Sequence, residues 1–186
     1  MPPRPPRVSR PAAAAAALLL PLLVAGCDPN ETAFAPACPK LSLLRDAADV
    51  TRFAGPPGAP HDAGTLALAA HITAIPAKCE PGGKDKVRAR LQVAADVRRG
   101  PAAPGDTANV RFFVALTEQD RILNEKDDVL TAKFRPNVDQ VRVTSNELIL
   151  DLPVSKGKTA AAYHLYVGFR LTPDELAYNR QIAGAQ

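Results

Sequence analysis

The chain has 186 residues, with 23 Lys and Arg against 19 Asp and Glu, three cysteines and no tryptophan. Three of the basic residues lie within residues 1–26, so the rest of the chain carries 20 basic and 19 acidic side chains. This balance argues against nucleic acid as a partner, because binding it needs a basic surface on the folded domain. The length suits one domain with a substantial core.

The N-terminus is rich in Pro and Arg, lacks acidic residues and leads into an Ala/Leu segment too short to cross a bilayer as a helix. This segment ends in Val24-Ala25-Gly26-Cys27, which resembles the lipobox of bacterial lipoproteins, whose cysteine is acylated. We therefore expect residues 1–26 to be a lipoprotein signal peptide and Cys27 to carry the lipid that holds the protein on a membrane. An ordinary secretory peptide cut elsewhere and a signal anchor are the alternatives.

Residues 27–36 show no hydrophobic periodicity and are expected to form a short tether to the folded domain. Asp28 directly follows the predicted lipidated cysteine. An acidic residue at this position resembles the signal that retains lipoproteins of enteric bacteria in the inner membrane. We expect the inner membrane rather than the outer one, with the domain in the periplasm in either case.

Two cysteines, Cys38 and Cys79, are left once Cys27 is assigned to lipid. An even pair in an exported chain predicts a disulfide, because the envelope is oxidising. A redox or metal-binding pair is the alternative, but the sequence has no CxxC motif and no histidine close to either cysteine. We expect a structural disulfide.

Apolar and polar residues alternate along several segments, most clearly from Val87 to Val97. A period of two residues predicts half-buried antiparallel strands rather than helices. Loops rich in Pro and Gly are expected at 54–60, 80–84 and 100–105. The other expected strands are Lys40–Leu44, Leu66–Ala74, Val110–Thr117, Leu130–Phe134, Tyr163–Leu171 and either one long or two short strands within Gln140–Leu152.

About seven such strands predict a mainly β domain over residues 37–182. The expected architecture is a two-layer antiparallel β-sandwich, immunoglobulin-like or fibronectin-like, and a small antiparallel barrel is the alternative. In this sandwich the disulfide would join the start of the first strand to the end of the second.

The end of the chain follows a different pattern. Thr172 is a predicted N-cap, Pro173 occupies the first helical position, and Glu175 stands where a capping box needs an acid. A short helix is therefore expected from Pro173 to about Gln181. Residues 183–186 are expected to form a frayed tail.

No catalytic constellation is evident in the sequence. His61, His71 and His164 lack the spacing of metal ligands. His61 is in a Pro/Gly loop, and His71 and His164 occupy outward strand positions where they are expected to be solvated. No nucleotide-binding or nucleophile motif is present. We therefore expect no enzymatic activity, no cofactor and no metal site. The acidic segment Glu125–Asp128 lacks the pattern of a calcium loop and is expected to be a solvated hairpin tip.

Four arginines are candidates for a basic surface: Arg88, Arg90, Arg98 and Arg111. They occupy outward positions of the predicted strands, where a basic stripe would face anionic headgroups near the anchor. The alternative is that these charges keep a sheet face soluble and prevent strand edges from pairing.

Three features together resemble a family: the lipobox, the cysteine pair and the segment Leu171-Thr-Pro-Asp-Glu-Leu-Ala-Tyr-Asn-Arg180. They are similar to those of uncharacterised small lipoproteins of alphaproteobacteria. The resemblance covers most of residues 37–180, including Cys38-Pro39 and the segment Ala47–Phe53. It implies an envelope lipoprotein and transfers no catalytic residue.

The expected function is that of a non-catalytic binding or assembly module, held by lipid in the periplasm, with an envelope protein or a wall component as partner. One alternative is a carrier of a small ligand or lipid, which would need a hollow core. The other is an envelope hydrolase whose site forms only in the folded chain.

Overall fold

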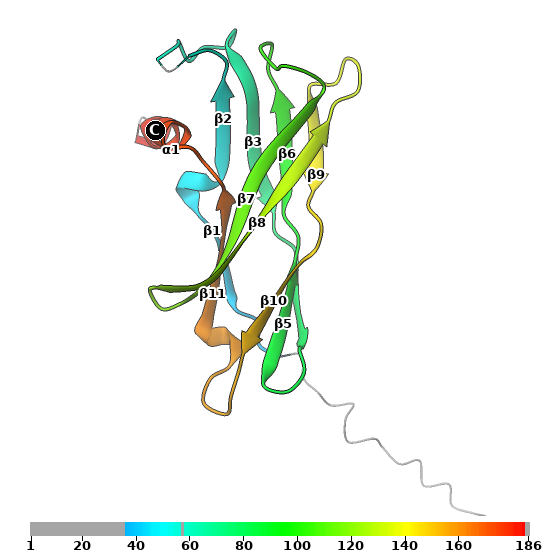
Figure 1. Cartoon of the computed structure of the whole chain (residues 1–186), viewed down its shortest axis with the longest axis vertical. Helices are drawn as coiled ribbons and strands as arrows, with labels where there is room; N and C mark the ends of the chain where they lie inside the picture. The colour runs from blue at the N-terminus through cyan, green and yellow to red at the C-terminus, as the bar shows by residue number, and fades with distance from the viewer. Residues whose placement is uncertain (1–35, 57, 185–186) are drawn as a thin grey trace, which may run out of the picture. The chain divides into compact units, whose positions relative to one another are not determined.

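The structure is a computed structural model, which describes residues 36–56 and 58–184. The elements in these residues are β1 Lys40–Leu43, η1 Arg45–Ala47, β2 Asp49–Phe53, β3 Leu66–Ala74, β4 Ala77–Pro81, β5 Lys86–Leu91, β6 Ala94–Arg99, β7 Thr107–Glu118, β8 Arg121–Lys133, β9 Gln140–Thr144, β10 Leu148–Pro153, η2 Ala160–Ala162, β11 Tyr163–Phe169 and α1 Pro173–Gly184. The strands form three sheets, with the orders β1-β11-β7-β8, β2-β3-β6-β9 and β10-β5-β4 (Figure 1).

Two layers of sheet enclose one hydrophobic core. The first sheet forms one layer, and the second and third sheets together form the other. The second and third sheets share a layer because the chain passes from β3 into β4, from β5 into β6 and from β9 into β10 across short breaks. Buried side chains from all three sheets, such as Phe112, Val97 and Leu91, belong to the same core. The expected mainly β, two-layer antiparallel sandwich with a short C-terminal helix is confirmed.

The strand order contains one parallel pair at the edge of the first sheet. β1 runs parallel to β11, with Leu41 opposite Leu165, whereas β11 pairs with β7 in the antiparallel sense. The strand that precedes β11 in the chain, β10, lies in the other layer. The chain therefore changes layer after β8 and again before β11.

The described residues form eleven strands rather than about seven. Val87–Val97 was expected to be one strand, but β5 ends at Leu91 and β6 begins at Ala94. The chain also breaks between β3 and β4, and the two breaks lie side by side, because Gln92 N–H donates to Pro76 O at 3.0 Å. Pro76 has no N–H for the ladder. Val93 is nevertheless fully buried, so the period-two pattern continues through the break and cannot reveal it.

Two further strands have no clear alternation in sequence. β2 has one buried residue, Val50, and β4 has none. Both strands lie at the edge of their sheets. These two strands bury few side chains in the core, so their sequence carries a weaker pattern than that of β10, which is also an edge strand but alternates fully. The segment Gln140–Leu152 forms the two short strands that were one of the expected alternatives.

β8 is much longer than the expected strand Leu130–Phe134. The prediction of a hairpin tip at Glu125–Asp128 was wrong, because these residues lie within β8 and the β7–β8 turn is at Gln119–Asp120. They are mostly exposed at the edge of the first sheet, so this part of the strand has the charged composition expected of a turn. Lys126 Nζ donates to Ile149 O on β10 at 2.7 Å, which places a charge against an unpaired strand edge.

Cys38 and Cys79 form the predicted disulfide, with Sγ atoms 2.07 Å apart and Cα atoms 5.6 Å apart. The bond joins the chain just before β1 to β4, the fourth strand rather than the second. Because β1 and β4 belong to different layers, the disulfide links the two layers covalently.

The capping box of α1 is present as expected. Glu175 N–H donates to Thr172 Oγ1 at 3.2 Å, and Thr172 N–H donates to Glu175 Oε2 at 2.7 Å. The helix runs to Gly184, beyond the expected end near Gln181. Within the described residues no helix has the length and apolar character needed to span a membrane.

One end of the sandwich collects the start of the described chain and three turns. The turn between β4 and β5 contacts the turn after β10, where Val154 N–H donates to Asp85 O at 2.9 Å. The β7–β8 hairpin tip reaches the same turn through an ion pair between Glu118 and Lys158. We call this the tether end and define it as residues 36–40, 78–88, 118–121 and 151–158.

The opposite end carries α1 and the loops before β3, before β7 and after β8 (Figure 1). β11 begins beside the tether end, where Tyr163 pairs with Glu118, and leads the chain to α1 at the other end. Phe134 N–H donates to Asp106 O at 2.7 Å, so two of these loops are in contact. We call α1 and these three loops, with the strand ends next to them, the groove end, after the groove described below.

Candidate functional site

A groove of about 590 Å³ opens at the groove end, between α1 and the residues of β2 and the β2–β3 loop. One wall is formed by Arg52, Phe53 and His61, and the other by Glu175 and Tyr178. The two walls come from segments that are more than a hundred residues apart in the sequence. Their meeting depends on β11, which delivers α1 to the edge of β2.

Three rings form an aromatic cluster in this groove. Phe53 and His61 stack with their ring centroids 4.5 Å apart and an interplanar angle of 11°. Tyr178 meets both rings edge-on, with centroid distances of 5.2 Å to Phe53 and 5.5 Å to His61. Phe53 and Tyr178 are half-buried and His61 is exposed, so the cluster presents apolar ring surface to a ligand.

An ion pair closes the inner side of the groove. Arg52 Nε is 2.8 Å from Glu175 Oε1, and the Glu175 side chain is only 10% exposed. Arg52 Nη1 also donates to Asn109 O on β7 at 3.0 Å, so Arg52 connects α1 to both layers. Glu175 therefore serves two purposes, since it caps its own helix and holds that helix against β2.

The β2–β3 loop is held in shape by a turn at Asp62. Asp62 Oδ1 accepts from Gly64 N–H at 2.8 Å and from Thr65 N–H at 2.9 Å. The Thr65 backbone bond is the largest cause of the lowered pKa of Asp62. Gly55 has a φ of 121°, and a Cβ there would lie 2.7 Å from the Ala59 Cβ. These contacts hold the described part of the loop around His61 in one conformation.

α1 is attached mainly through polar contacts. Its one buried residue is Asn179, whose Nδ2 donates to Asp46 O at 2.9 Å and to Asp49 O at 2.8 Å. Arg180 Nε lies 3.0 Å from Asp46 Oδ2. The Asn179 Oδ1 atom is buried without a hydrogen-bond partner among the described residues. Asn179 therefore fixes where the helix sits and, with it, the width of the groove.

The chemistry of the groove favours binding. Stacked aromatic rings offer flat apolar surfaces to sugar rings or to apolar peptide side chains. The Tyr178 hydroxyl and the Asp174 carboxylate add polar atoms at the groove wall. In the part of the chain that the structure describes, no three His, Cys, Asp or Glu side chains are grouped closely enough to hold a metal ion.

The three histidines lie in different parts of the structure. His71 Nδ1 lies 2.7 Å from Asp49 Oδ1 in the second sheet, whereas His164 Nε2 lies 2.8 Å from Ser42 Oγ in the first sheet. Burial lowers the pKa of His164, with a smaller effect from the charge of Lys40. His61 alone belongs to the groove.

The four arginines proposed as a basic surface lie in three different sheets. Arg88 and Arg90 are on β5, Arg98 is on β6 and Arg111 is on β7. Arg111 Nη2 is 3.5 Å from Asp127 Oδ2. The structure therefore does not bring these residues together as one stripe.

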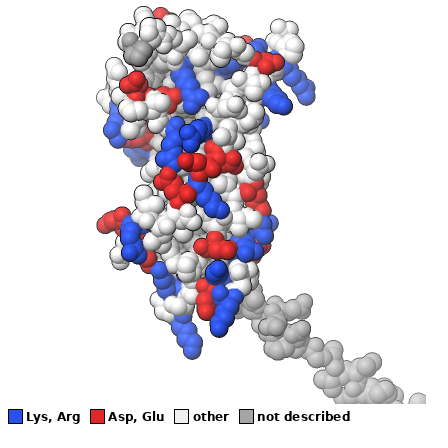
Figure 2. Space-filling model, viewed as in Figure 1, with Lys and Arg blue, Asp and Glu red and all other residues white. Residues whose placement is uncertain are grey.

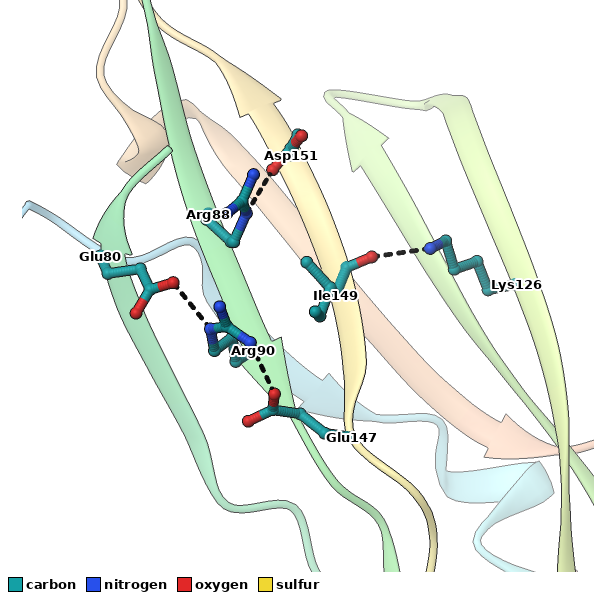
Figure 3. Close-up of polar contacts among 7 residues, drawn as sticks. All are labelled: Glu80, Arg88, Arg90, Lys126, Glu147, Ile149 and Asp151. Atoms are coloured by element: carbon teal, nitrogen blue, oxygen red, sulfur yellow. Dashed lines mark hydrogen bonds and ion pairs between the residues drawn. The ribbon is translucent and has the colours of Figure 1, made fainter. Parts of the chain in front are cut away.

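The two arginines of β5 are engaged by neighbouring carboxylates (Figure 3). Arg88 Nε is 2.9 Å from Asp151 Oδ1. Arg90 lies 2.7 Å from Glu80 Oε1 through Nε and 2.7 Å from Glu147 Oε2 through Nη1. The hydrogen bond to Arg90 lowers the pKa of Glu80, while Glu80 and Glu147 raise that of Arg90. These charges largely cancel on the sheet surface.

The predicted lipidation residue Cys27 and the sorting residue Asp28 lie outside the described residues, so both stay predictions. Comparison of the chain with family models, with curated proteins and with solved structures gives no match in any of the three. The resemblance to alphaproteobacterial lipoproteins likewise stays a prediction.

Sequence reasoning missed the groove. Nothing in the sequence linked Tyr178 to Phe53 or to His61. No local motif joins positions 53, 61 and 178. Strand β2, which carries Phe53, has too little alternation to be recognised as a strand, so the groove wall itself was not predicted.

Proposed function

We propose that the protein is a lipid-anchored envelope lipoprotein whose sandwich acts as a non-catalytic binding or assembly module in the periplasm, with its partner bound in the groove between α1 and β2. The observation that carries this proposal is the aromatic cluster of Phe53, His61 and Tyr178 in an open groove of about 590 Å³. Half-buried aromatic rings at a concave surface are typical of binding sites.

The direction in which the chain leaves the sandwich supports this arrangement. The first described residues are joined to β4 by the disulfide at the tether end, and the groove opens at the opposite end. A lipid on Cys27 would hold the tether end near the bilayer. The groove would then face away from the membrane, where an envelope protein or a wall component can reach it.

A photo-crosslinking experiment in cells tests the groove. A photoreactive amino acid replaces Ala177, which is exposed at the groove wall, and a control chain carries it at Ala161, which is exposed in η2, before β11. We expect adducts with an envelope protein or wall fragment from position 177 only. Combining the probe with Tyr178→Ala should remove these adducts. Identical adducts from both positions would contradict a groove-specific partner.

The anchor is tested separately. Cys27→Ala should abolish labelling by a fatty-acid analogue and leave an unprocessed or soluble product. Cys79→Ala serves as a control, because it also removes a cysteine but should keep the label. Normal labelling of the Cys27→Ala chain would overturn the lipoprotein proposal.

A further inference from the structure

The positive charge of the described residues is concentrated at the tether end. Residues 36–56 and 58–184 contain 20 Lys and Arg and 17 Asp and Glu. The tether end holds eight of these basic residues and five of the acidic ones, so the rest of the described chain is balanced at twelve of each. The basic residues of this end are Lys40, Lys78, Lys84, Lys86, Arg88, Arg121, Lys156 and Lys158, and the acidic ones are Glu80, Asp85, Glu118, Asp120 and Asp151.

Five lysines at this end are exposed and form no ion pair with a carboxylate of the described residues. These lysines are Lys40, Lys78, Lys84, Lys86 and Lys156. Two unpaired carboxylates, Asp85 and Asp120, stand beside them. Figure 2 shows Lys and Arg at the lower tips of the sandwich, whereas basic and acidic side chains alternate over the middle of the same face. Lys84 and Lys156 lie in turns and Lys86 begins β5, whereas Lys40 begins β1 and Lys78 lies within β4.

Lys84, Lys86 and Lys156 lie in or beside two turns that contact each other through the hydrogen bond from Val154 N–H to Asp85 O. Lys86 lies opposite Pro153 at the end of the β5–β10 ladder. Lys156 is in the turn closed by the bridge between Ser155 and Lys158. The disulfide fixes the start of the described chain to β4, the strand next to β5. The lysines and the point at which the chain enters the sandwich therefore share one surface.

The length of the intervening chain limits the distance between this surface and any lipid on Cys27. From Cys27 to Pro36 there are nine residue steps. At about 3.3–3.6 Å per residue a fully extended chain spans at most ~32 Å, and any less extended chain brings the domain nearer. Lysines within about 8–10 Å of anionic headgroups gain electrostatic attraction that salt screens at longer distances.

We propose that the unpaired lysines of the tether end contact anionic phospholipid headgroups and hold the sandwich upright on the bilayer, with the groove directed away from it. This inference rests on the proposed lipid anchor at Cys27. The lipid supplies attachment, and the lysines supply orientation. It replaces the predicted stripe of Arg88, Arg90, Arg98 and Arg111, which the structure spreads over three sheets and partly neutralises.

The test uses the full acylated chain, purified in detergent and reconstituted into nanodiscs of phosphatidylcholine alone or with phosphatidylglycerol. A fluorophore on Gly157→Cys reports the tether end, and one on Gly105→Cys reports the groove end. Both glycines leave open space for a Cβ and neither has a positive φ. Quenching by lipids with spin-labelled headgroups measures how near each end lies to the membrane. We expect phosphatidylglycerol to increase quenching at position 157, high salt to reverse this increase, and position 105 to stay unquenched.

Charge reversal makes the test specific. The triple variant Lys84→Glu, Lys86→Glu and Lys156→Glu should lose the effect of phosphatidylglycerol. A matched triple at the groove end, Arg98→Glu, Lys133→Glu and Arg135→Glu, changes the net charge equally at exposed residues that also lack ion pairs in the described chain, and should keep it. Thermal unfolding checks that both variants fold.

The outcomes separate the two proposals. Chains that fail to enter nanodiscs of either composition would overturn the lipid anchor and this inference with it. Anchored chains whose quenching at position 157 ignores phosphatidylglycerol, or responds equally in both triple variants, would overturn the inference and leave the anchor standing.

Discussion

The two ends of the sandwich use polar residues in different ways. At the groove end, polar side chains face inward and connect elements, as when Asn179 bonds two backbone carbonyls and Arg52 links Glu175 to β7. At the tether end, a covalent bond between Cys38 and Cys79 holds the layers together, and the lysines are left exposed. The attachment of α1 at the groove end thus depends on polar side chains, whereas at the tether end the disulfide joins the layers and five lysines have no ion pair within the described residues.

The largest effect is expected from the tether end. Replacing both Cys38 and Cys79 with Ala removes a cross-link between residues 41 positions apart, which should lower the free energy of unfolding by about 4 kcal/mol. Chemical denaturation measures the change, and reduction of the wild-type protein should give a similar loss. An unchanged midpoint would show that the disulfide does not stabilise this end.

The second effect concerns the attachment of α1. Asn179→Ala removes two hydrogen bonds from a buried amide to backbone carbonyls, which should cost about 2–3 kcal/mol. Hydrogen exchange should report loss of protection in α1 and β2 before any change at the tether end. The exposed neighbour Gln181 provides the control, since Gln181→Ala should change little. Equal loss of protection at both ends would mean that the ends are not independent.

A smaller effect is expected from the β2–β3 loop. Gly55→Ala forces a side chain onto a φ of 121° and against Ala59, at a cost on the order of 1–2 kcal/mol. The groove should lose its partner while the core keeps its circular dichroism spectrum. Gly105→Ala, in open space without a positive φ, is the matched control. Unimpaired crosslinking from position 177 in Gly55→Ala would show that the loop conformation does not define the groove.

The smallest effect is the response to acid, which both ends should share. Hydrogen bonds from Thr65, Lys158 and Arg88 are the largest causes of the lowered pKa values of Asp62, Glu118 and Asp151, respectively. Folded carboxyls with lowered pKa values add stability that is complete above their unfolded pKa near 4 and is lost as the pH falls through the folded value. Titration followed by nuclear magnetic resonance should give midpoints below 3.8 for Asp62 and Asp151 and below 4.5 for Glu118. Midpoints at or above those values would contradict the hydrogen bonds described.

Sequence patterns predicted much of the architecture but little of the groove. The alternation along Val87–Val97 correctly indicated an antiparallel sandwich, and the Thr172–Glu175 spacing correctly indicated the start of a helix. Both signals are local, because alternation and helix capping are each visible in the spacing of residues that are close together in the sequence. Strands β2 and β4 and the break at Gln92 were missed, because β2 and β4 bury few side chains and the break is set by the neighbouring part of the sheet.

The fold class and the capped helix could be predicted from residue spacing alone. The disulfide could be predicted because an even number of cysteines remains once Cys27 is set aside. Only the tertiary structure decided that Phe53, His61 and Tyr178 share a groove and that Arg88 and Arg90 are engaged by carboxylates. Those contacts depend on which strands become neighbours. Strand order is set by the packing of the whole core rather than by any segment of it, so residues far apart in the chain meet only once the two layers have closed.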